Sequence, residues 1–451
     1  MSKLKIEQYI QEDKTYIDNL TEDPGTKKVT KNLSKYNTIN QGDTIKYSLY
    51  LVNKSQPSFC SENGYYSSQT NCENAGYTWK TSDQSSITYQ NLIITGIVLY
   101  RENREVQNFF DENIFRKTVE EGSLAQIEIS NDANTHICAF DNHIGVLSNN
   151  IFTVYNTYAN QEFILNLTIT TPIFASNGDY LVVAEKNGKK VYLISNKNIV
   201  WQADVEGKIE KVTVNKNGYV AVSETQTSHK TVVVTYTPTG KELCKTYLSS
   251  TYAVDIEISA DNKYLAIAET NLSGIQIKSG IRIVSFEKVE QDVENAVIYK
   301  QDIGTNCLIT SIHYDKHNDL ICMLDSKIVK IKDNEIKEIA TFAENAIFAD
   351  IELENQMVQV INEGQEEIQT RIQTSNTTNG RSREYLINSI PKEIDTKENI
   401  IAVNTGSEAY FITATGFLMA KYEAKQEIKE IVIGDNFAGI IYKNKIELIN
   451  L

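Results

Sequence analysis

The chain has 451 residues, which is long enough for two or three domains and a large buried core. Apolar residues make up 41% of it and only 5 are prolines, so the composition is that of a globular protein and excludes collagen-like and linker-rich classes. The formal net charge is -15 and no block of Lys or Arg interrupts the sequence. We therefore expect no binding to nucleic acid and no polybasic contact with a membrane.

The first 25 residues carry apolar side chains at spacings of three and four, which predicts a short helix within 1–25. They contain no continuous apolar segment, so we expect neither a signal peptide nor a membrane anchor there. The longest apolar run of the chain, at 92–100, has the length of a strand rather than of a membrane span. We therefore expect no direct membrane insertion of this chain.

Residues 26–130 contain segments in which apolar and polar side chains alternate, most clearly at 44–51. This period of two is typical of half-buried strands and predicts a small β-sandwich-like domain. A polar loop at 53–85 interrupts the domain and holds Cys60 and Cys72. A disulfide between them would imply an oxidising compartment, and the alternative is two exposed thiols without a metal. The remaining cysteines lie in more apolar segments and are expected to be buried free thiols: Cys138, Cys244, Cys307 and Cys322.

From residue 131 onward the sequence repeats. Each copy has a polar turn, a tyrosine, an alternating apolar strand and a final Glu, and other short strands precede and follow it. Four strands in about 40 residues are the sequence signature of propeller blades, because each sheet needs neighbours to cover its apolar faces. We therefore predict an all-β fold in which 131–451 form a β-propeller. The clearest copies are 176–185, 215–224 and 260–269.

Counting innermost strands from His136 to the C-terminus predicts eight blades; seven is the alternative, because the region around Pro391 is hard to assign. The last copy begins at Ile428 and has three strands, so a strand within 91–130 is expected to complete its sheet and avoid an unpaired edge. We expect Trp201 and Tyr219 to pack between blades. Asn-Gly and Asp-Asn pairs indicate tight turns at 177–178, 187–188, 217–218 and 261–262.

A resemblance to a known family rests on four blocks of the repeat region, at 174–195, 205–223, 240–274 and 437–451. They resemble an uncharacterised β-propeller family of Gram-positive bacteria, a domain of unknown function, over about residues 150–451. Members usually carry an N-terminal membrane anchor and face outward, so the resemblance implies an extracytoplasmic or cell-surface location, although we expect no such anchor in the first 25 residues. It implies no catalytic residue. The segments at 39–55 and 89–100 are similar to Ig-like repeats of bacterial surface proteins.

The sequence lacks the motifs of covalent and phosphate chemistry. It has no G-x-S-x-G, G-x-x-x-x-G-K-[ST] or G-x-G-x-x-G pattern, and five histidines offer few bases. His313 and His317 are four residues apart, but on a strand and turn they need not share a face. We interpret them as two surface histidines near a β-turn rather than as metal ligands. We expect no catalytic residue, no metal site and no cofactor.

Acidic residues end the second strand of successive copies. Equivalent positions recur around one face of a propeller, so these acids are candidates for a partial ring that collects cations or a basic partner. The alternative is that each acid accepts hydrogen bonds in its own turn or pairs with a neighbouring lysine. The five candidates are Glu185, Glu224, Glu269, Asp325 and Glu363.

Three functions fit these features. The first is a non-catalytic scaffold or recognition module with a protein partner, at the bacterial cell envelope, because propellers present a broad rigid face. The second is a structural component of a secreted or phage-like particle, suggested by the cysteine loop and the β-rich N-terminal region. The third is a glycan-active enzyme, which would need paired carboxylates about 5 to 10 Å apart across a pocket.

Overall fold

The computed structural model of the chain divides into two compact units, Met1–Leu99 and Tyr100–Leu451. It describes residues 5–10, 47–52, 59–60, 73, 79–80, 110–111, 117–122, 124–130, 134–291, 296–362 and 370–451. Among these residues, no helix has both the length and the apolar character that crossing a membrane requires.

The described part of the first unit consists mainly of two pairs of antiparallel strands, β1 (Lys5–Ile10) with β2 (Tyr47–Val52) and β3 (Phe59–Cys60) with β4 (Trp79–Lys80). The helix expected within 1–25 is wrong for the residues of β1, because so short an apolar pattern fits both periods and pairing with β2 selects the strand. The β-sandwich-like domain and a bridge between Cys60 and Cys72 stay predictions, since Cys72 and most of 26–130 lie outside the described residues.

The second unit contains eight blades that follow one another along the chain. Blade 1 comprises β7 (Thr135–Phe140), β8 (His143–Ser148), β9 (Ile151–Asn156) and β10 (Gln161–Asn166); blade 2, β11 (Pro172–Asn177), β12 (Tyr180–Glu185), β13 (Lys190–Ser195) and β14 (Asn198–Asp204); blade 3, β15 (Lys208–Val214), β16 (Val220–Thr225), β17 (Thr231–Tyr236) and β18 (Glu242–Leu248); blade 4, β19 (Tyr252–Ile258), β20 (Tyr264–Asn271), β21 (Lys278–Ser285), helix α5 (Phe286–Gln291) and β22 (Val297–Thr305).

Blades 5 to 8 continue the pattern. Blade 5 comprises β23 (Ile309–Tyr314), β24 (Leu320–Leu324), β25 (Lys327–Lys332) and β26 (Glu335–Thr341); blade 6, β27 (Ala346–Asp350), β28 (Gln356–Asn362), β29 (Thr370–Asn376) and β30 (Ser382–Ile387); blade 7, β31 (Glu393–Lys397), β32 (Ile400–Asn404), β33 (Glu408–Thr413), β34 (Leu418–Glu423) and β5 (Thr118–Glu120); blade 8, β35 (Glu430–Ile433), β36 (Phe437–Ile441), β37 (Lys445–Asn450) and β6 (Ala125–Glu128).

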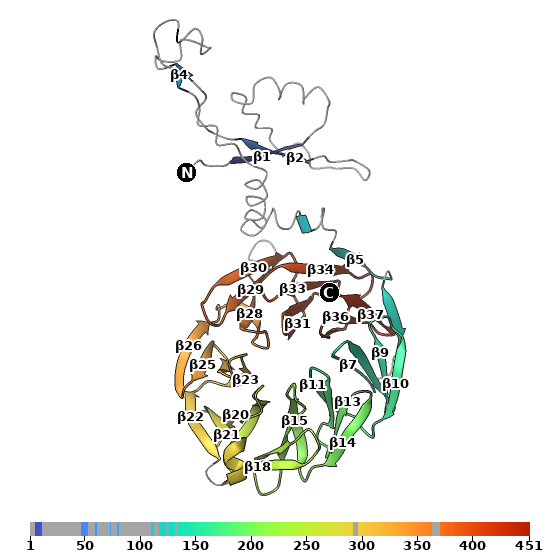
Figure 1. The fold of residues 1–451 in the computed structure, drawn as a ribbon, viewed down its shortest axis with the longest axis vertical. Helices are drawn as coiled ribbons and strands as arrows, with labels where there is room; N and C mark the ends of the chain where they lie inside the picture. Colours follow the sequence, from blue (N-terminus) through green and yellow to red (C-terminus); the bar gives the residue numbers. More distant parts are fainter. Residues whose placement is uncertain are drawn as a thin grey trace. The chain divides into compact units, whose positions relative to one another are not determined.

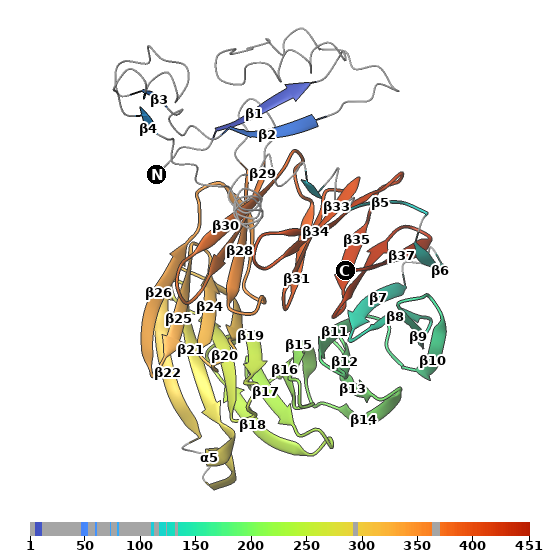
Figure 2. The same cartoon turned by 45° about the horizontal axis from the view of Figure 1, so that its top comes forward.

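In each blade the first strand lies innermost and the next strands pair outward from it (Figure 1). Neighbouring strands are antiparallel except for β34 and β5 of blade 7. The turns from first to second and from third to fourth strand therefore lie at one end of the ring, which we call the lower end. The turns from second to third strand and the connections between blades lie at the other, upper end. Figure 2 shows the sheets around the axis and α5 at one end of blade 4. The expected count of eight blades is confirmed, and Pro391 lies two residues before the inner strand of blade 7.

Strands that precede blade 1 in the sequence complete the ring. β6 pairs antiparallel with β37 and supplies the outer strand of blade 8, as the sequence predicted. β5 pairs in parallel with β34 and adds a fifth strand to blade 7. The propeller thus includes strands from Thr118 onward, ahead of the expected boundary at residue 131, because an unpaired edge of blade 8 would expose backbone groups.

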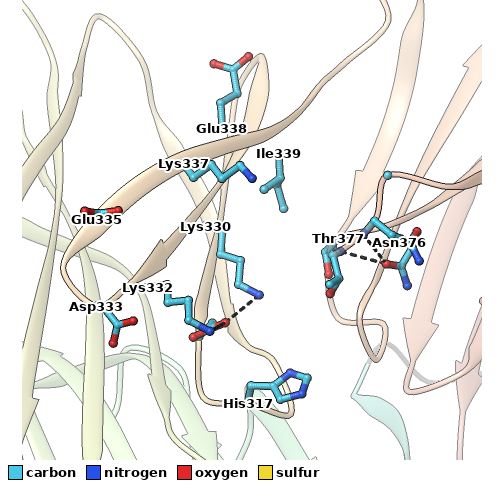
Figure 3. Close-up of a pocket in the computed structure, with 14 residues that line it drawn as sticks. His317, Lys330, Lys332, Asp333, Glu335, Lys337, Glu338, Ile339, Asn376 and Thr377 are labelled. Atoms are coloured by element: carbon cyan, nitrogen blue, oxygen red, sulfur yellow. Dashed lines mark hydrogen bonds and ion pairs between the residues drawn. The ribbon is translucent and has the colours of Figure 1, made fainter.

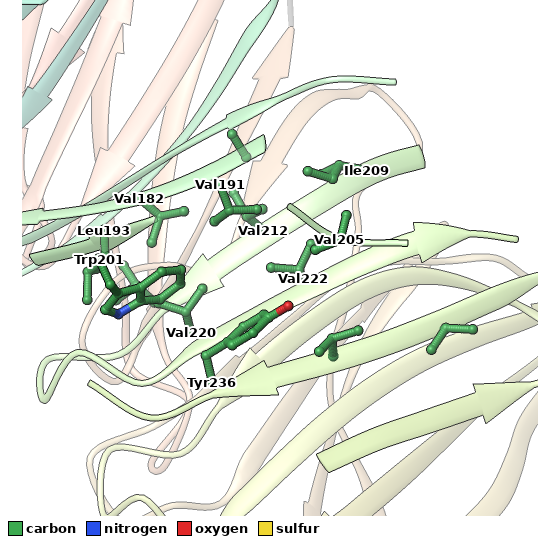
Figure 4. Close-up of a cluster of buried hydrophobic side chains, with 14 residues drawn as sticks. Val182, Val191, Leu193, Trp201, Val205, Ile209, Val212, Val220, Val222 and Tyr236 are labelled. Carbon is green, nitrogen blue, oxygen red and sulfur yellow. The ribbon is translucent and has the colours of Figure 1, made fainter. Parts of the chain in front are cut away.

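The hydrophobic core lies between adjacent blades. Val182 and Leu193 of blade 2 pack with Val222 of blade 3 in the cluster that Figure 4 shows. At its edge the rings of Trp201 and Tyr236 lie 5.3 Å apart, so Trp201 packs between blades as expected. All six residues of β17 are buried, because each face of that sheet covers a neighbouring blade. This burial on both faces explains the nearly continuous apolar runs in the sequence.

Two further local predictions match the structure. Asn187 and Asn262 adopt φ values of 59° and 62° in tight turns, a conformation that asparagine tolerates better than most residues. Tyr219 stacks with Phe286 of α5, with ring centroids 6.3 Å apart. The cysteines of the propeller are free thiols. Cys138, Cys244 and Cys322 are buried, and Cys307 is partly buried.

Candidate functional site

The acids at the ends of the second strands lie at the upper end of the ring. Glu185 ends β12, and its carboxylate accepts hydrogen bonds from the backbone N–H of Thr170 (2.9 Å) and of Thr171 (3.2 Å), and from the Thr170 hydroxyl (2.7 Å). Glu224 in β16 is fully buried and accepts from the backbone N–H of Gly207 (2.9 Å) and from the Gln226 side-chain amide. Both acids thus fasten the connection that leads into their own blade.

The remaining candidates differ from one another. The Glu269 carboxylate in β20 accepts two hydrogen bonds from the Arg282 guanidinium, both 3.1 Å long, and one from the Thr251 hydroxyl. Asp325 is exposed next to Ser326, and Glu363 lies outside the described residues. Each of the three glutamates accepts hydrogen bonds from its own blade or from the connection that leads into it. A shared ring that collects cations stays a prediction.

A second set of charged residues, which the sequence did not single out, belongs to the inner strands. β19, β23 and β27 each contain a bulge near their start. Glu257, His313 and Asp350 follow these bulges at equivalent positions of blades 4, 5 and 6. We call these three residues, together with Glu352, which follows β27, and Asp395 of the inner strand β31, the axial cluster. Four of its five members lie on the inner strands of the consecutive blades 4 to 7, which surround the axis (Figure 1).

Hydrogen bonds join two blades within the axial cluster. One oxygen of the Glu257 carboxylate lies 3.2 Å from Nδ1 of His313, and the other accepts from the backbone N–H of Tyr314 at 2.9 Å. In the next row, Asp255 pairs with Lys211 of blade 3 at 2.5 Å and accepts from the backbone N–H of Ile312 at 2.8 Å. Charged side chains of the inner strands therefore link blades 3, 4 and 5.

Residues of the axial cluster shift one another's pKa values. Burial lowers the pKa of His313, but the facing carboxylates, first Glu257 and then Glu352 and Asp350, outweigh burial and raise this pKa to about 9. Although Glu352 is exposed, desolvation by the surrounding residues, and then repulsion from Asp350, raises its pKa to about 7. Burial, followed by repulsion from Asp350 and Glu393, raises the pKa of Asp395 to about 7. These acids therefore take up protons in the neutral range.

The two histidines considered as a pair are separate in the structure. His313 lies within β23 and binds Glu257, whereas His317 lies in the following turn with 59% of its side chain exposed. The interpretation as two surface histidines is therefore wrong for His313, because the strand directs it toward a carboxylate of blade 4. Within the described ranges, no three His, Cys, Asp or Glu side chains are grouped as a metal site would require.

The alignment of the repeat on its second strands does not bring out the polar residues of the first, inner strands. The repeat is clearest in the second strands, where tyrosine and glutamate recur. The bulges of the first strands shift their register, so equivalent positions are difficult to recognise without the pairing. Aligning 253–258, 309–314 and 346–350 on their bulges would have placed Glu257, His313 and Asp350 together.

Apolar side chains gather at the upper end of blade 4. Ile275 is fully exposed and Leu272 is 55% exposed in the turn between β20 and β21. Both strands are eight residues long, against six in β16 and β17 of blade 3, so this hairpin is the longer one. We call the exposed residues of this region the blade 4 patch: Tyr252, Leu272, Ile275, Ile277 and Leu308.

Contacts with blade 3 and with the end of blade 4's own outer strand hold the blade 4 patch together. Lys230 of blade 3 donates to the Ser273 hydroxyl at 3.0 Å, and its ammonium lies 4.8 Å from the centre of the Tyr252 ring. On the other side, the backbone N–H of Asn306 donates to the carbonyl of Ile277 at 2.8 Å. The patch is therefore a fixed part of the upper end, extending from blade 3 to the connection between blades 4 and 5.

Eight four- or five-stranded sheets arranged around an axis, the last closed by a strand from the N-terminal side, define an eight-bladed β-propeller. Residues 116–451 match the model of the family described as "Family of unknown function (DUF5711)". The chain belongs to that family, which confirms the expected resemblance to a propeller family without a known function.

Two solved structures are similar to this chain at low sequence identity. The C-terminal WD40 domain of Sif2 is 12% identical, with a TM-score of 0.51, and the match covers 72% of this chain and 98% of that one. BamB from Moraxella catarrhalis is 10% identical, with a TM-score of 0.46, over 73% of this chain and 99% of that one. No curated protein matches the chain in sequence.

Proposed function

We propose that this propeller is a non-catalytic interaction module that binds a protein partner at the upper end of its ring. The blade 4 patch is the observation that carries the proposal. Clustered, exposed aliphatic side chains on a rigid hairpin are unfavourable in water, and a partner that covers them recovers that free energy. Tyr252 adds an aromatic ring of the kind that dominates many binding energies.

The chemistry of the described residues supports binding without catalysis. Burial raises the pKa of the Cys244 thiol to about 11 and that of Cys138 still further, so neither forms the thiolate that a nucleophile needs. Glu185, Glu224 and Glu269 direct their carboxylates at groups of their own blades. A rigid scaffold with connections converging on one end suits recognition.

We place this partner at the bacterial cell envelope. The support is the resemblance of the repeat blocks to a propeller family whose members face outward. Fractionation of the host cells, followed by detection of the chain in the cytoplasmic and envelope fractions, tests this part of the proposal independently of the binding surface. Recovery in the cytoplasmic fraction alone would contradict it.

The binding surface is tested with two matched double variants of the full chain. Leu272→Ser with Ile275→Ser removes the tip of the blade 4 patch. Ile164→Ser with Val200→Ser removes two other exposed aliphatic residues, which are 51% and 47% exposed on the outer strands of blades 1 and 2. Because all four side chains are exposed, we expect both variants to fold with unchanged unfolding midpoints.

Affinity capture from the host with each chain then compares what is bound. We expect a set of proteins that the wild-type chain and the control variant retain and that the tip variant loses. An identical set with all three chains would show that the patch is not the binding surface. Turnover of glycan substrates by the purified chain would instead favour an enzyme, and self-association in light scattering would favour a structural component of a particle.

A further inference from the structure

A pocket of about 730 Å³ opens at the lower end of the ring, opposite to the blade 4 patch. The outer hairpin of blade 5 forms one wall, and the turn between β29 and β30 of blade 6 forms the other (Figure 3). Neighbouring sheets of a propeller diverge away from the axis, and here the space between them is not filled by side chains. Its volume is that of a site for a small molecule.

Hydrogen-bond donors from blade 5 face this space. Figure 3 shows Lys330, Lys337 and His317 directed toward the gap between the blades. Glu335 and Glu338 of the same hairpin also line the pocket. Lys330 and Lys337 are direct partners on the antiparallel strands β25 and β26. Two like charges in such a position repel each other unless a counter-charge is present.

Carboxylates neutralise one of these lysines. The Lys330 ammonium lies 2.7 Å from Asp315 and 2.9 Å from Asp319, and Asp315 is almost completely buried. This pairing uses two of its three hydrogens, which leaves one for another acceptor. Lys337 has no ion-pair partner among the described residues, so it remains an uncompensated cation in the wall of the pocket.

The opposite wall contributes a hydroxyl without a partner. Thr377 is 8% exposed, and its Oγ1 is buried without a hydrogen bond in the described part of the chain. Its backbone is fixed, since the N–H of Thr377 donates to the carbonyl of Asn355 at 3.0 Å. The neighbouring Asn376 accepts hydrogen bonds from the N–H groups of Thr378 and Asn379, both 3.0 Å long, which holds the turn rigid. A buried hydroxyl left unpaired is costly, so an acceptor or donor that enters the pocket would stabilise it.

We propose that this pocket between blades 5 and 6 binds a small ligand through an oxyanion, a carboxylate or a phosphate. Lys337 supplies the charge, Lys330 its third hydrogen, and the Thr377 hydroxyl a neutral donor from the other blade. The chemistry is the same for a free anion and for a lipid headgroup that carries a phosphate. The site is distinct from the protein-binding surface proposed above, and either proposal stands without the other.

The test uses the full chain with three probes: inorganic phosphate, succinate, and vesicles of phosphatidylglycerol. Calorimetry measures the dissociation constants of the two free anions, and co-sedimentation measures vesicle binding. Lys337→Gln removes the charge, and Thr377→Val removes the hydroxyl while keeping the shape of the side chain. Lys300→Gln on the outer strand of blade 4 is the control, because that lysine is likewise exposed and lies outside the pocket.

We expect the two pocket variants each to weaken binding of the effective probe about tenfold, which is the usual effect of losing a hydrogen bond to a charged group. The control should leave the dissociation constant unchanged. Thr377→Val should fold at least as stably as the wild type, because it removes an unpaired buried hydroxyl. Binding of phosphate or succinate identifies a free anion, and binding of vesicles alone identifies a headgroup. If no probe binds at millimolar concentration, or if the pocket variants bind as well as the control, the proposal is wrong.

Discussion

The hydroxyl of Tyr422 donates to the carboxylate of Glu447 at 2.7 Å, across the seam between blades 7 and 8. Both residues are fully buried. The same carboxylate accepts from the backbone N–H of Gly122, at 3.0 and 3.1 Å to its two oxygens, in the segment that joins β5 to β6. Glu447, in the last blade, is thus hydrogen-bonded both to blade 7 and to the closing segment.

Glu447→Gln should therefore weaken the seam. The substitution removes the charge that Gly122 and Tyr422 bind and leaves the adjacent Lys445 with Glu121 alone. We expect the free energy of unfolding to fall by about 2 to 4 kcal/mol, because hydrogen bonds to a buried charge are lost. Urea unfolding of the variant measures this loss. Glu344→Gln, an exposed acid in the loop before β27, is the matched control and should change the free energy by less than about 0.5 kcal/mol.

Removal of the closing segment should open the ring. A chain that begins at residue 131 lacks β5 and β6, and with them Ile127, which is 4% exposed and lies opposite Ile446 in the sheet. The loss of Ile127 alone should cost about 2 to 5 kcal/mol, and the unpaired edge of β37 should promote self-association. Light scattering and thermal unfolding measure both effects. A chain that begins at residue 116 retains both strands, and equal behaviour of the two truncated chains would contradict the role of the segment.

The pair of Arg282 and Glu269 offers a test of whether the acids at the upper end are structural. Arg282→Met leaves the Glu269 carboxylate, which is 4% exposed, without its main partner. We expect a loss of about 3 to 5 kcal/mol in the free energy of unfolding, since an unpaired buried charge is strongly unfavourable. Lys300→Met is the control, because Lys300 is the exposed cross-strand neighbour of Arg282. Tighter Ca²⁺ binding by the wild type than by Glu224→Gln or Glu269→Gln chains would instead support the shared ring.

The repeat made most of the fold predictable from the sequence, because a propeller is built from local units. Four short strands per copy indicated the blades, and the three-stranded last copy indicated that an earlier strand closes the ring. β5 was not predictable, since its parallel pairing with β34 joins residues about 300 positions apart without a sequence pattern of its own. The helix expected near the N-terminus failed for Lys5–Ile10 because six residues do not determine a period.

The candidate site was predictable only in part. Glu185, Glu224 and Glu269 occupy equivalent positions, as the second strands indicated, but their partners Thr170, Gly207 and Arg282 follow from tertiary contacts that the repeat does not encode. The axial cluster depends on bulges that shift one strand by a residue, and the pocket between blades 5 and 6 depends on an unfilled space. Neither leaves a periodic signal in the sequence.

The axial cluster should make the stability of the propeller fall as the pH rises from about 5 to 9. The pKa of His313 is raised from 6.5 to about 9, so its stabilising contribution is complete below pH 6.5 and is lost as the pH rises through 9. The pKa of Glu352 is raised from 4.5 to about 7, and that of Asp395 from 3.8 to about 7. Their protonated forms fit the folded ring better, so their contribution is also lost as the pH rises, mainly between 4.5 and 7.

Urea unfolding at a series of pH values measures this dependence. Glu352→Gln and Asp395→Asn should flatten the curve between pH 5 and 7, because their side chains stay neutral throughout, whereas His313→Gln should flatten it between 6.5 and 9. Glu121 does not offset the trend. Although partial burial raises its pKa, Lys445 lowers it to about 2, so its contribution is lost only as the pH falls below 4.5. A free energy of unfolding that rises with pH across the neutral range would show that these side chains do not face one another as described.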